Sequence, residues 1–177
     1  MPRSVDLRLD PQTAKIAYVE RASLVRRTNG TKQDRMLIPA KGRQCVAWLQ
    51  DKVSIKVLIE LAEPGCLIVR PWSPYGEEVV ARLQSVEVDD GIDIKDRSLI
   101  VGASIKFLPS TIEASARLTF HEPFERHLAI SPGESPELYV LCSVDRIEIW
   151  SEQYYTDAHR RLGGKLRKFF PWSGTQY

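Results

Sequence analysis

The feature that most constrains the fold of this chain is an internal repeat. The pair Trp72-Ser73 recurs as Trp150-Ser151, 78 positions later. Each pair follows a short apolar segment and opens a segment with helical signals. An upstream arginine also recurs, as Arg35 and Arg117, which are 82 positions apart. The same order of strand, loop, strands and helix, found twice, predicts two diverged copies of one small β-rich unit.

Alternation of apolar and polar residues predicts strands in both halves, with turn residues between them. The expected strands are 15–20, 35–38, 53–61, 66–70, 105–108, 116–120, 138–142 and 146–150. Helices are expected at 74–83, as a short turn at 121–128, and from the N-cap residue Ser151 to Leu162, where Gly163-Gly164 should end the helix. Segment 96–103 fits either a helix or a strand. The predicted class is mainly β with short helices, an α+β chain.

A unit of this size cannot close a core alone, because small domains bury too little of their surface. Two copies can share one core, and exchanged hairpins complete the sheets of such units. We therefore expect one compact, pseudo-symmetric barrel made of two tandem swapped-hairpin units. The expected organisation is a lead-in with the first strand (1–24), a first unit (25–86), an acidic connector (87–104), a second unit (105–162) and a basic aromatic tail (163–177).

Composition argues against several functional classes. No window approaches the roughly 18 apolar residues of a membrane-spanning helix, and the first 20 residues lack a signal peptide, so a cytoplasmic protein is expected. The cysteines are odd in number and far apart, the histidines have no metal spacing, and no nucleophile elbow or phosphate-binding loop is present. We expect no catalytic residues, no metal, no cofactor and no enzymatic activity. The residues concerned are Cys45, Cys66, Cys142, His121, His127 and His159.

The charges are segregated, although the formal net charge is only +2. Segment 21–50 holds seven basic residues and one acid, whereas segment 77–96 holds seven acids. The stretch 160–168 adds five basic residues and no acid. Such segregation creates a local positive field, although charge runs are often no more than a solvated surface.

The repeated segments resemble the MraZ family, regulators of the bacterial division and cell-wall cluster with AbrB-like (SpoVT-AbrB) swapped-hairpin β-barrels. The resemblance rests on RMLIPAKGR (35–43), CLIVRPWSPY (66–75) and VDRIEIWSEQYY (144–155), and it covers roughly residues 25 to 162. It implies a DNA-binding transcriptional regulator that acts as a homo-oligomer, such as a dimer or a ring, on repeated boxes of double-stranded DNA. Such a protein would be associated with the nucleoid.

This chain keeps only part of the signature turns of that family. The family pattern is Asp, three residues, then Arg, with Gly usually before the Arg. The first copy (31–35) keeps only Arg35, and the second copy (113–117) keeps an acid, Glu113, and Arg117 but not the Gly. The resemblance therefore supports the fold more strongly than it supports DNA binding.

The resemblance places Arg35 and Arg117 at the DNA-contacting positions, where an arginine on a rigid turn can bind phosphate or guanine. The first copy is the more basic, and we expect it to make the main contacts with DNA. The alternatives are an ordinary exposed Arg35 and an Arg117 held by Glu113 in a salt bridge. Neighbouring cations expected to contact phosphate are Lys32, Lys41, Arg43, Arg26, Arg27 and Arg126.

Two further functions stay open. The incomplete signature turns and the low net charge favour a duplicated β-barrel that serves assembly or protein interaction and has lost DNA binding. An antitoxin-like regulator is a variant in which the barrel binds DNA and the tail (163–177) captures a protein partner. The tail mixes cations with Phe169, Phe170 and Trp172, which suits contact with DNA, an acidic protein groove or an anionic membrane surface, although the tail is too short for a stable membrane anchor.

Overall fold

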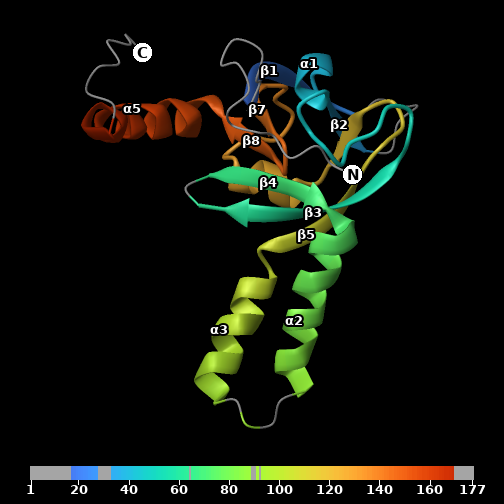
Figure 1. Cartoon of the computed structure of the whole chain (residues 1–177), viewed down its shortest axis with the longest axis vertical. Helices are drawn as coiled ribbons and strands as arrows, with labels where there is room; N and C mark the ends of the chain where they lie inside the picture. The colour runs from blue at the N-terminus through green and yellow to red at the C-terminus, as the bar shows by residue number, and fades with distance from the viewer. Residues whose placement is uncertain (1–16, 28–32, 64, 89–90, 92, 170–177) are drawn as a thin grey trace.

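The computed structural model describes residues 17–27, 33–63, 65–88, 91 and 93–169. Within these residues, eight antiparallel strands form a closed barrel in the order β1-β2-β6-β5-β3-β4-β8-β7. Strand β7 closes the ring by pairing with β1. Two helical parts project from this barrel (Figure 1). The mainly β class expected from the sequence is confirmed.

The strands are β1 (Ala17–Val25), β2 (Asp34–Leu37), β3 (Ile55–Ala62), β4 (Cys66–Pro71), β5 (Phe107–Ile112), β6 (Arg117–Phe120), β7 (Glu137–Ser143) and β8 (Ile147–Ser151). The helices are α1 (Ala40–Arg43), η1 (Trp72–Gly76), α2 (Glu77–Val88), α3 (Ile94–Ser104), α4 (Glu122–His127) and α5 (Glu152–Phe169).

The barrel interior follows from the two-residue period of its strands. In β7, Leu138, Val140 and Cys142 are buried, and the residues between them are half-buried. Across the barrel, Val57 and Ile59 of β3 point into the same core. Each such side chain, fully removed from water, stabilises the fold by about 1.5–3 kcal/mol. The core also contains Leu24, Met36, Ile38, Leu67, Val69, Ile112, Leu118, Phe120, Phe124, Leu128, Ile147 and Ile149.

The strand order has a regularity that relates the two halves of the chain. When the strands of the two halves are exchanged (β1 with β5, β2 with β6, β3 with β7 and β4 with β8), every pair of neighbouring strands in the barrel becomes another pair of neighbouring strands. The halves meet along four seams, and on two of them, β2 with β6 and β4 with β8, each strand pairs with its counterpart four places along the chain; the other two seams are β3 with β5 and β1 with β7. On the first two seams Met36 lies opposite Leu118, and Val69 lies opposite Ile147. The paired residues are 82 and 78 positions apart, the same spacings as the repeated arginines and the repeated Trp-Ser pairs.

Short helices follow β2 and β6. Helix α1 packs against β1 and β7. Helix α4 buries Phe124 completely, and the ring of Phe124 meets the edge of Phe120 with centroids 5.6 Å apart. Pro123 at the start of α4 suits the first turn of a helix, where no intrahelical N–H bond is lost.

Longer helices follow β4 and β8. Helices α2 and α3 form a hairpin that extends away from the barrel, and α5 leaves the barrel on another side (Figure 1). The start of α5 is fixed to β7 by a stacked pair, Tyr155 on Tyr139, with ring centroids 4.1 Å apart. Gly65, in the turn between β3 and β4, has a φ of +141°, and any Cβ there would overlap the ring of Tyr154. A glycine is therefore required where this turn meets α5.

Two boundaries differ from the sequence predictions. Helix α5 does not end at Gly163-Gly164 but continues to Phe169. The helical context there outweighs the intrinsic preference of glycine for ending a helix. The ambiguous segment 96–103 lies within the helix α3, so the expected acidic connector (87–104) includes regular structure. Residues 1–16 of the expected lead-in and 170–177 of the tail lie outside the described residues.

Candidate nucleic-acid interface

The two arginines singled out by the sequence lie on adjacent strands. Arg35 is on β2 and Arg117 begins β6, and the register places Leu37 of β2 opposite Arg117. Because Met36 and Leu118 point into the core, Arg35, Leu37 and Arg117 belong to the outer face of the barrel. Arg35 and Arg117 are therefore diagonal neighbours, whose Cβ atoms are typically about 7–8 Å apart. The fold brings the two repeated arginines onto one surface.

Arg35 is restrained by an acid from the second copy. Its Nη1 lies 3.2 Å from Oε2 of Glu113, and about 30% of each side chain is exposed. The Nε of Arg35 is buried and has no hydrogen-bond partner. A buried N–H without a partner is costly, and this Nε–H can still donate to one further acceptor. The alternative of an ordinary exposed Arg35 is wrong, because the side chain is half-buried and paired.

Arg117 is exposed and forms no ion pair or hydrogen bond through its side chain with any described residue. The expected alternative, a salt bridge between Arg117 and Glu113, is wrong, since Glu113 reaches across to Arg35 instead. The turn before Arg117 is closed by two backbone bonds: the N–H of Glu113 donates to the carbonyl of Arg117, and that of Ala116 to the carbonyl of Glu113. Ala116 has a φ of 62°, so the alanine adopts the left-handed conformation that the family's glycine would favour.

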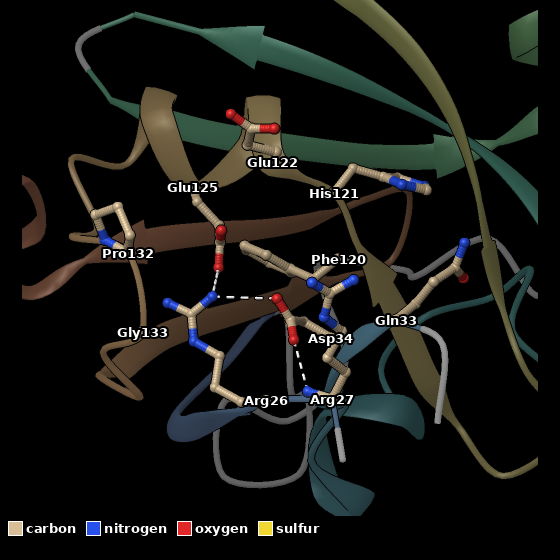
Figure 2. Close-up of a pocket in the computed structure, with 10 residues that line it drawn as sticks. All are labelled: Arg26, Arg27, Gln33, Asp34, Phe120, His121, Glu122, Glu125, Pro132 and Gly133. Atoms are coloured by element: carbon tan, nitrogen blue, oxygen red, sulfur yellow. Dashed lines mark hydrogen bonds and ion pairs between the residues drawn. The ribbon is translucent and has the colours of Figure 1, made fainter. Parts of the chain in front are cut away.

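Arg26 has a structural environment. Its guanidinium lies between Asp34 and Glu125, pairing with Asp34 at 3.1 Å and also with Glu125, and its side chain is about 21% exposed (Figure 2). The same group donates to the backbone carbonyls of Ser131 and Glu134. These bonds join the end of β1, the start of β2 and α4. We leave Arg26 out of the interface, because its charge is already neutralised by two carboxylates.

The remaining predicted cations are dispersed around this face. Arg27 is exposed, and its backbone N–H donates to Asp34 at 2.6 Å. Lys41 is exposed on α1, and Arg43 is half-buried with its Nε lacking a partner. Arg126 is exposed but lies 3.6 Å from Glu122, one turn earlier on α4. Lys32 lies outside the described residues.

A cavity of about 580 Å³ opens beside the Arg26 cluster (Figure 2). Its lining is mixed in charge, with Arg26 and Arg27 facing the acids Asp34, Glu122 and Glu125. A site that recognises phosphate needs an excess of positive charge, so this lining does not favour a phosphate ligand.

His121 stands between this cavity and a second hollow of about 430 Å³. One ring nitrogen lies 3.3 Å from the Ser110 hydroxyl, which itself donates to the carbonyl of Thr119. Burial lowers the pKa of the His121 imidazole below its ordinary value. The ring also meets the edge of Phe124. These contacts describe a half-buried structural histidine.

The acids that organise this face were not foreseen as site residues, apart from Glu113. Asp34 and Glu125 are 91 positions apart, and nothing in the sequence pattern links them to Arg26. For Glu113, the signal was the acid kept in the second signature turn, but its partner was assigned incorrectly.

The described residues give no support for a metal centre, since no three of their His, Cys, Asp and Glu side chains gather in a way that could hold an ion. The three cysteines are free thiols. Burial raises the pKa of Cys66 and of Cys142 to about 12, so neither is a thiolate at neutral pH. In the part of the chain that is described, no helix has both the length and the apolar character to cross a membrane.

Comparison with known proteins adds no assignment. No family model matches the chain. A search of curated proteins likewise finds no significant match.

Proposed function

We propose that this chain is an MraZ-like DNA-binding transcriptional regulator, built from two tandem swapped-hairpin units and acting as a homo-oligomer on repeated DNA boxes. Within each chain, Arg117 is the main contact to DNA and Arg35 a secondary one. The observation that carries the proposal is Arg117, which is exposed, follows a tight turn and pairs with no other described residue, with its repeat counterpart Arg35 on the neighbouring strand.

The strand order and register support the duplication. A two-fold relation between halves requires equivalent residues to face each other where the halves meet. Met36 with Leu118, and Val69 with Ile147, meet this requirement at the spacings of 82 and 78 found in the sequence. Each half contains two hairpins, β1-β2 and β3-β4 in the first and β5-β6 and β7-β8 in the second, and the hairpins of the two halves alternate around the barrel.

The chemistry of Arg117 suits DNA better than it suits a structural role. An arginine fixed at the start of a strand offers a rigid fork of donors to phosphate oxygens or to O6 and N7 of guanine. The closed turn from Glu113 to Arg117 holds its backbone, so binding costs little backbone entropy. Exposed Arg27 and Lys41 lie on neighbouring elements and suit phosphate contacts that position the protein.

The proposed interface is asymmetric, contrary to the expectation that the first copy reads DNA. Glu113 neutralises Arg35, and a carboxylate beside a phosphate contact opposes binding. The first copy would therefore contribute less than its basic sequence suggests. One good contact per chain gives weak binding, which explains why an oligomer on repeated boxes is part of the proposal.

The test is binding of the full chain to the DNA upstream of its own gene, measured by mobility shift across about 50 to 200 mM salt. Loss of one base or phosphate contact costs about 1–3 kcal/mol, so Arg117→Ala should weaken binding roughly tenfold or more. Arg35→Ala should weaken it less. Arg146→Ala, at a partly exposed arginine between β7 and β8, is the matched control. No retardation at low salt by folded protein, or equal binding by the Arg117 and Arg146 variants, would refute the proposal.

The second candidate is a duplicated β-barrel that serves protein interaction, or an antitoxin-like protein, with no DNA binding. It is favoured by the acids that neutralise candidate cations: Glu113 on Arg35, and Glu122 on Arg126. Under this reading, the same mobility shift shows nothing at low salt, while the purified chain still forms a stable complex with itself or with another protein.

A further inference from the structure

The α2/α3 hairpin carries an exposed apolar surface that the chain itself does not cover. Ile94 is 81% exposed, Leu99 72%, Val101 51% and Ile105 71%. No side chain of α3 is buried, and a Cβ on Gly102 would meet no atom within 4 Å. The principal packing of α3 is against α2 alone. By helical spacing Ile94, Val101 and Ile105 share one face of α3, whereas Leu99 lies on another side. Exposed apolar side chains that share one face mark an interaction surface more often than a solvated one.

The same hairpin is acidic. Between positions 77 and 96 the sequence holds seven acids and two bases. Among the described acids, Asp93 and Asp96 are exposed at the start of α3, next to the apolar surface. Neither forms an ion pair with another described residue. A partner for this hairpin should therefore combine an apolar side with a cluster of positive charge.

Helix α5 has these properties. It is strongly amphipathic, more so than α2 or α3. From position 160 to 168 its sequence holds five cations and no acid, and Arg160 and Arg161 are exposed. Its main contacts with the barrel are to β7 and β8 near its start. It also leaves the barrel on a different side from the hairpin, so it does not lie on the hairpin of its own chain (Figure 1).

We propose that α5 of one copy docks on the α2/α3 hairpin of a second copy. Helix α5 covers the face of α3 that carries Ile94, Val101 and Ile105, and Arg160 and Arg161 pair with the acids at the start of α3. Because two different surfaces meet, the contact is head-to-tail, and repetition of it builds a ring or a chain. The inference rests on the oligomeric part of the proposed function but does not require DNA binding.

The test is the association of the full chain, measured by sedimentation velocity across micromolar concentrations without DNA. Reversing the charge of one surface, with Arg160→Glu and Arg161→Glu, should weaken association about tenfold or more, since like charges then face each other. Asp93→Lys with Asp96→Lys should do the same. Combining all four reversals should restore association toward that of the original protein, because the ion pairs are re-formed with opposite polarity.

The control reverses two exposed acids of the barrel, Glu20→Lys and Asp51→Lys, and should leave association unchanged. Circular dichroism of every variant checks that it is folded. A second variant, Val101→Glu, should weaken association even at high salt, because it disrupts the apolar part. A monomeric original protein, or a fourfold variant no better than the double variants, overturns the inference. Loss of DNA binding in Arg117→Ala with association intact would show that DNA contact and association use different surfaces, so that either proposal can fail without the other.

Discussion

Replacing Ala129 with glycine should stabilise the protein, because Ala129 holds a backbone conformation that suits glycine. It follows the C-cap residue Leu128 of α4 and has a φ of 56°. The N–H of Ala129 donates to the carbonyl of Arg126 at 3.2 Å, and that of Ile130 to the carbonyl of Glu125 at 2.9 Å. These two bonds form a Schellman motif, in which the residue in the position of Ala129 is usually glycine.

The magnitude follows from two opposing terms. The left-handed conformation costs an L-residue about 1–2 kcal/mol. Glycine removes this cost but loses about 0.5–1 kcal/mol more conformational entropy on folding. Ala129 is exposed, so no buried methyl group is lost. The net gain is about 0.5–1 kcal/mol, which in a chain of this length raises Tm by about 2 °C.

The assay is equilibrium unfolding in urea, with the free energy of unfolding obtained by linear extrapolation. Ala81→Gly is the matched control, because Ala81 is exposed within α2, where glycine costs about 1 kcal/mol. The two substitutions are chemically identical and should change stability in opposite directions. If Ala129→Gly were neutral or destabilising with an unchanged m-value, the argument from the left-handed backbone would be wrong.

Three further predictions follow from the same face of the barrel. Glu113→Gln should release Arg35, raise DNA affinity at low salt and steepen the dependence of log K on log salt by about 0.9; weaker binding in the mobility shift would show that Glu113 positions Arg35 instead. Because burial lowers the pKa of His121, the unfolded state takes up its proton first as pH falls, so stability is lost on acidification below about 6.5. The urea midpoint of His121→Gln should therefore fall less between neutral and mildly acid pH than that of the original protein. Phe124→Ala should cost about 3–5 kcal/mol in urea unfolding, because the ring is fully buried; a loss below 1 kcal/mol would mean that α4 repacks.

The strands and the repeat could be predicted because short stretches of sequence carry the signals for them. A strand such as β7 shows its buried face as a two-residue alternation, and the repeated Trp-Ser pairs mark the same junction in each half. The closed order of the strands depends on which edges meet. That information lies in packing between distant segments. From the sequence, the barrel could be predicted only through the family resemblance and the two repeat spacings.

The site was harder to predict than the fold, because side-chain partners are chosen in three dimensions. Arg26 was expected at the DNA surface from the basic character of its segment. Its actual partners, Asp34 and Glu125, come from a different strand and from a helix in the other half of the chain. Helix α5 shows the same limit, since the glycines 163 and 164 predicted an end that the structure does not have.

Glu113 of the second copy pairs with Arg35 of the first copy, so the two turns would not be equivalent in DNA binding. In a symmetric pair of turns, each arginine would be equally free, and one chain would offer two equivalent contacts. Here the acid of the second turn pairs with Arg35 of the first, and Arg117 is left unpaired among the described residues. Under the proposed duplication, the two turns would have separate tasks, because one stabilises the barrel and the other would be free for a ligand. A DNA-binding chain with one free turn would gain affinity only by association, since linked weak contacts raise the effective concentration of each other. The asymmetry at Glu113 and the uncovered surface of α3 are thus consistent with a protein whose binding unit is the assembly rather than the single chain.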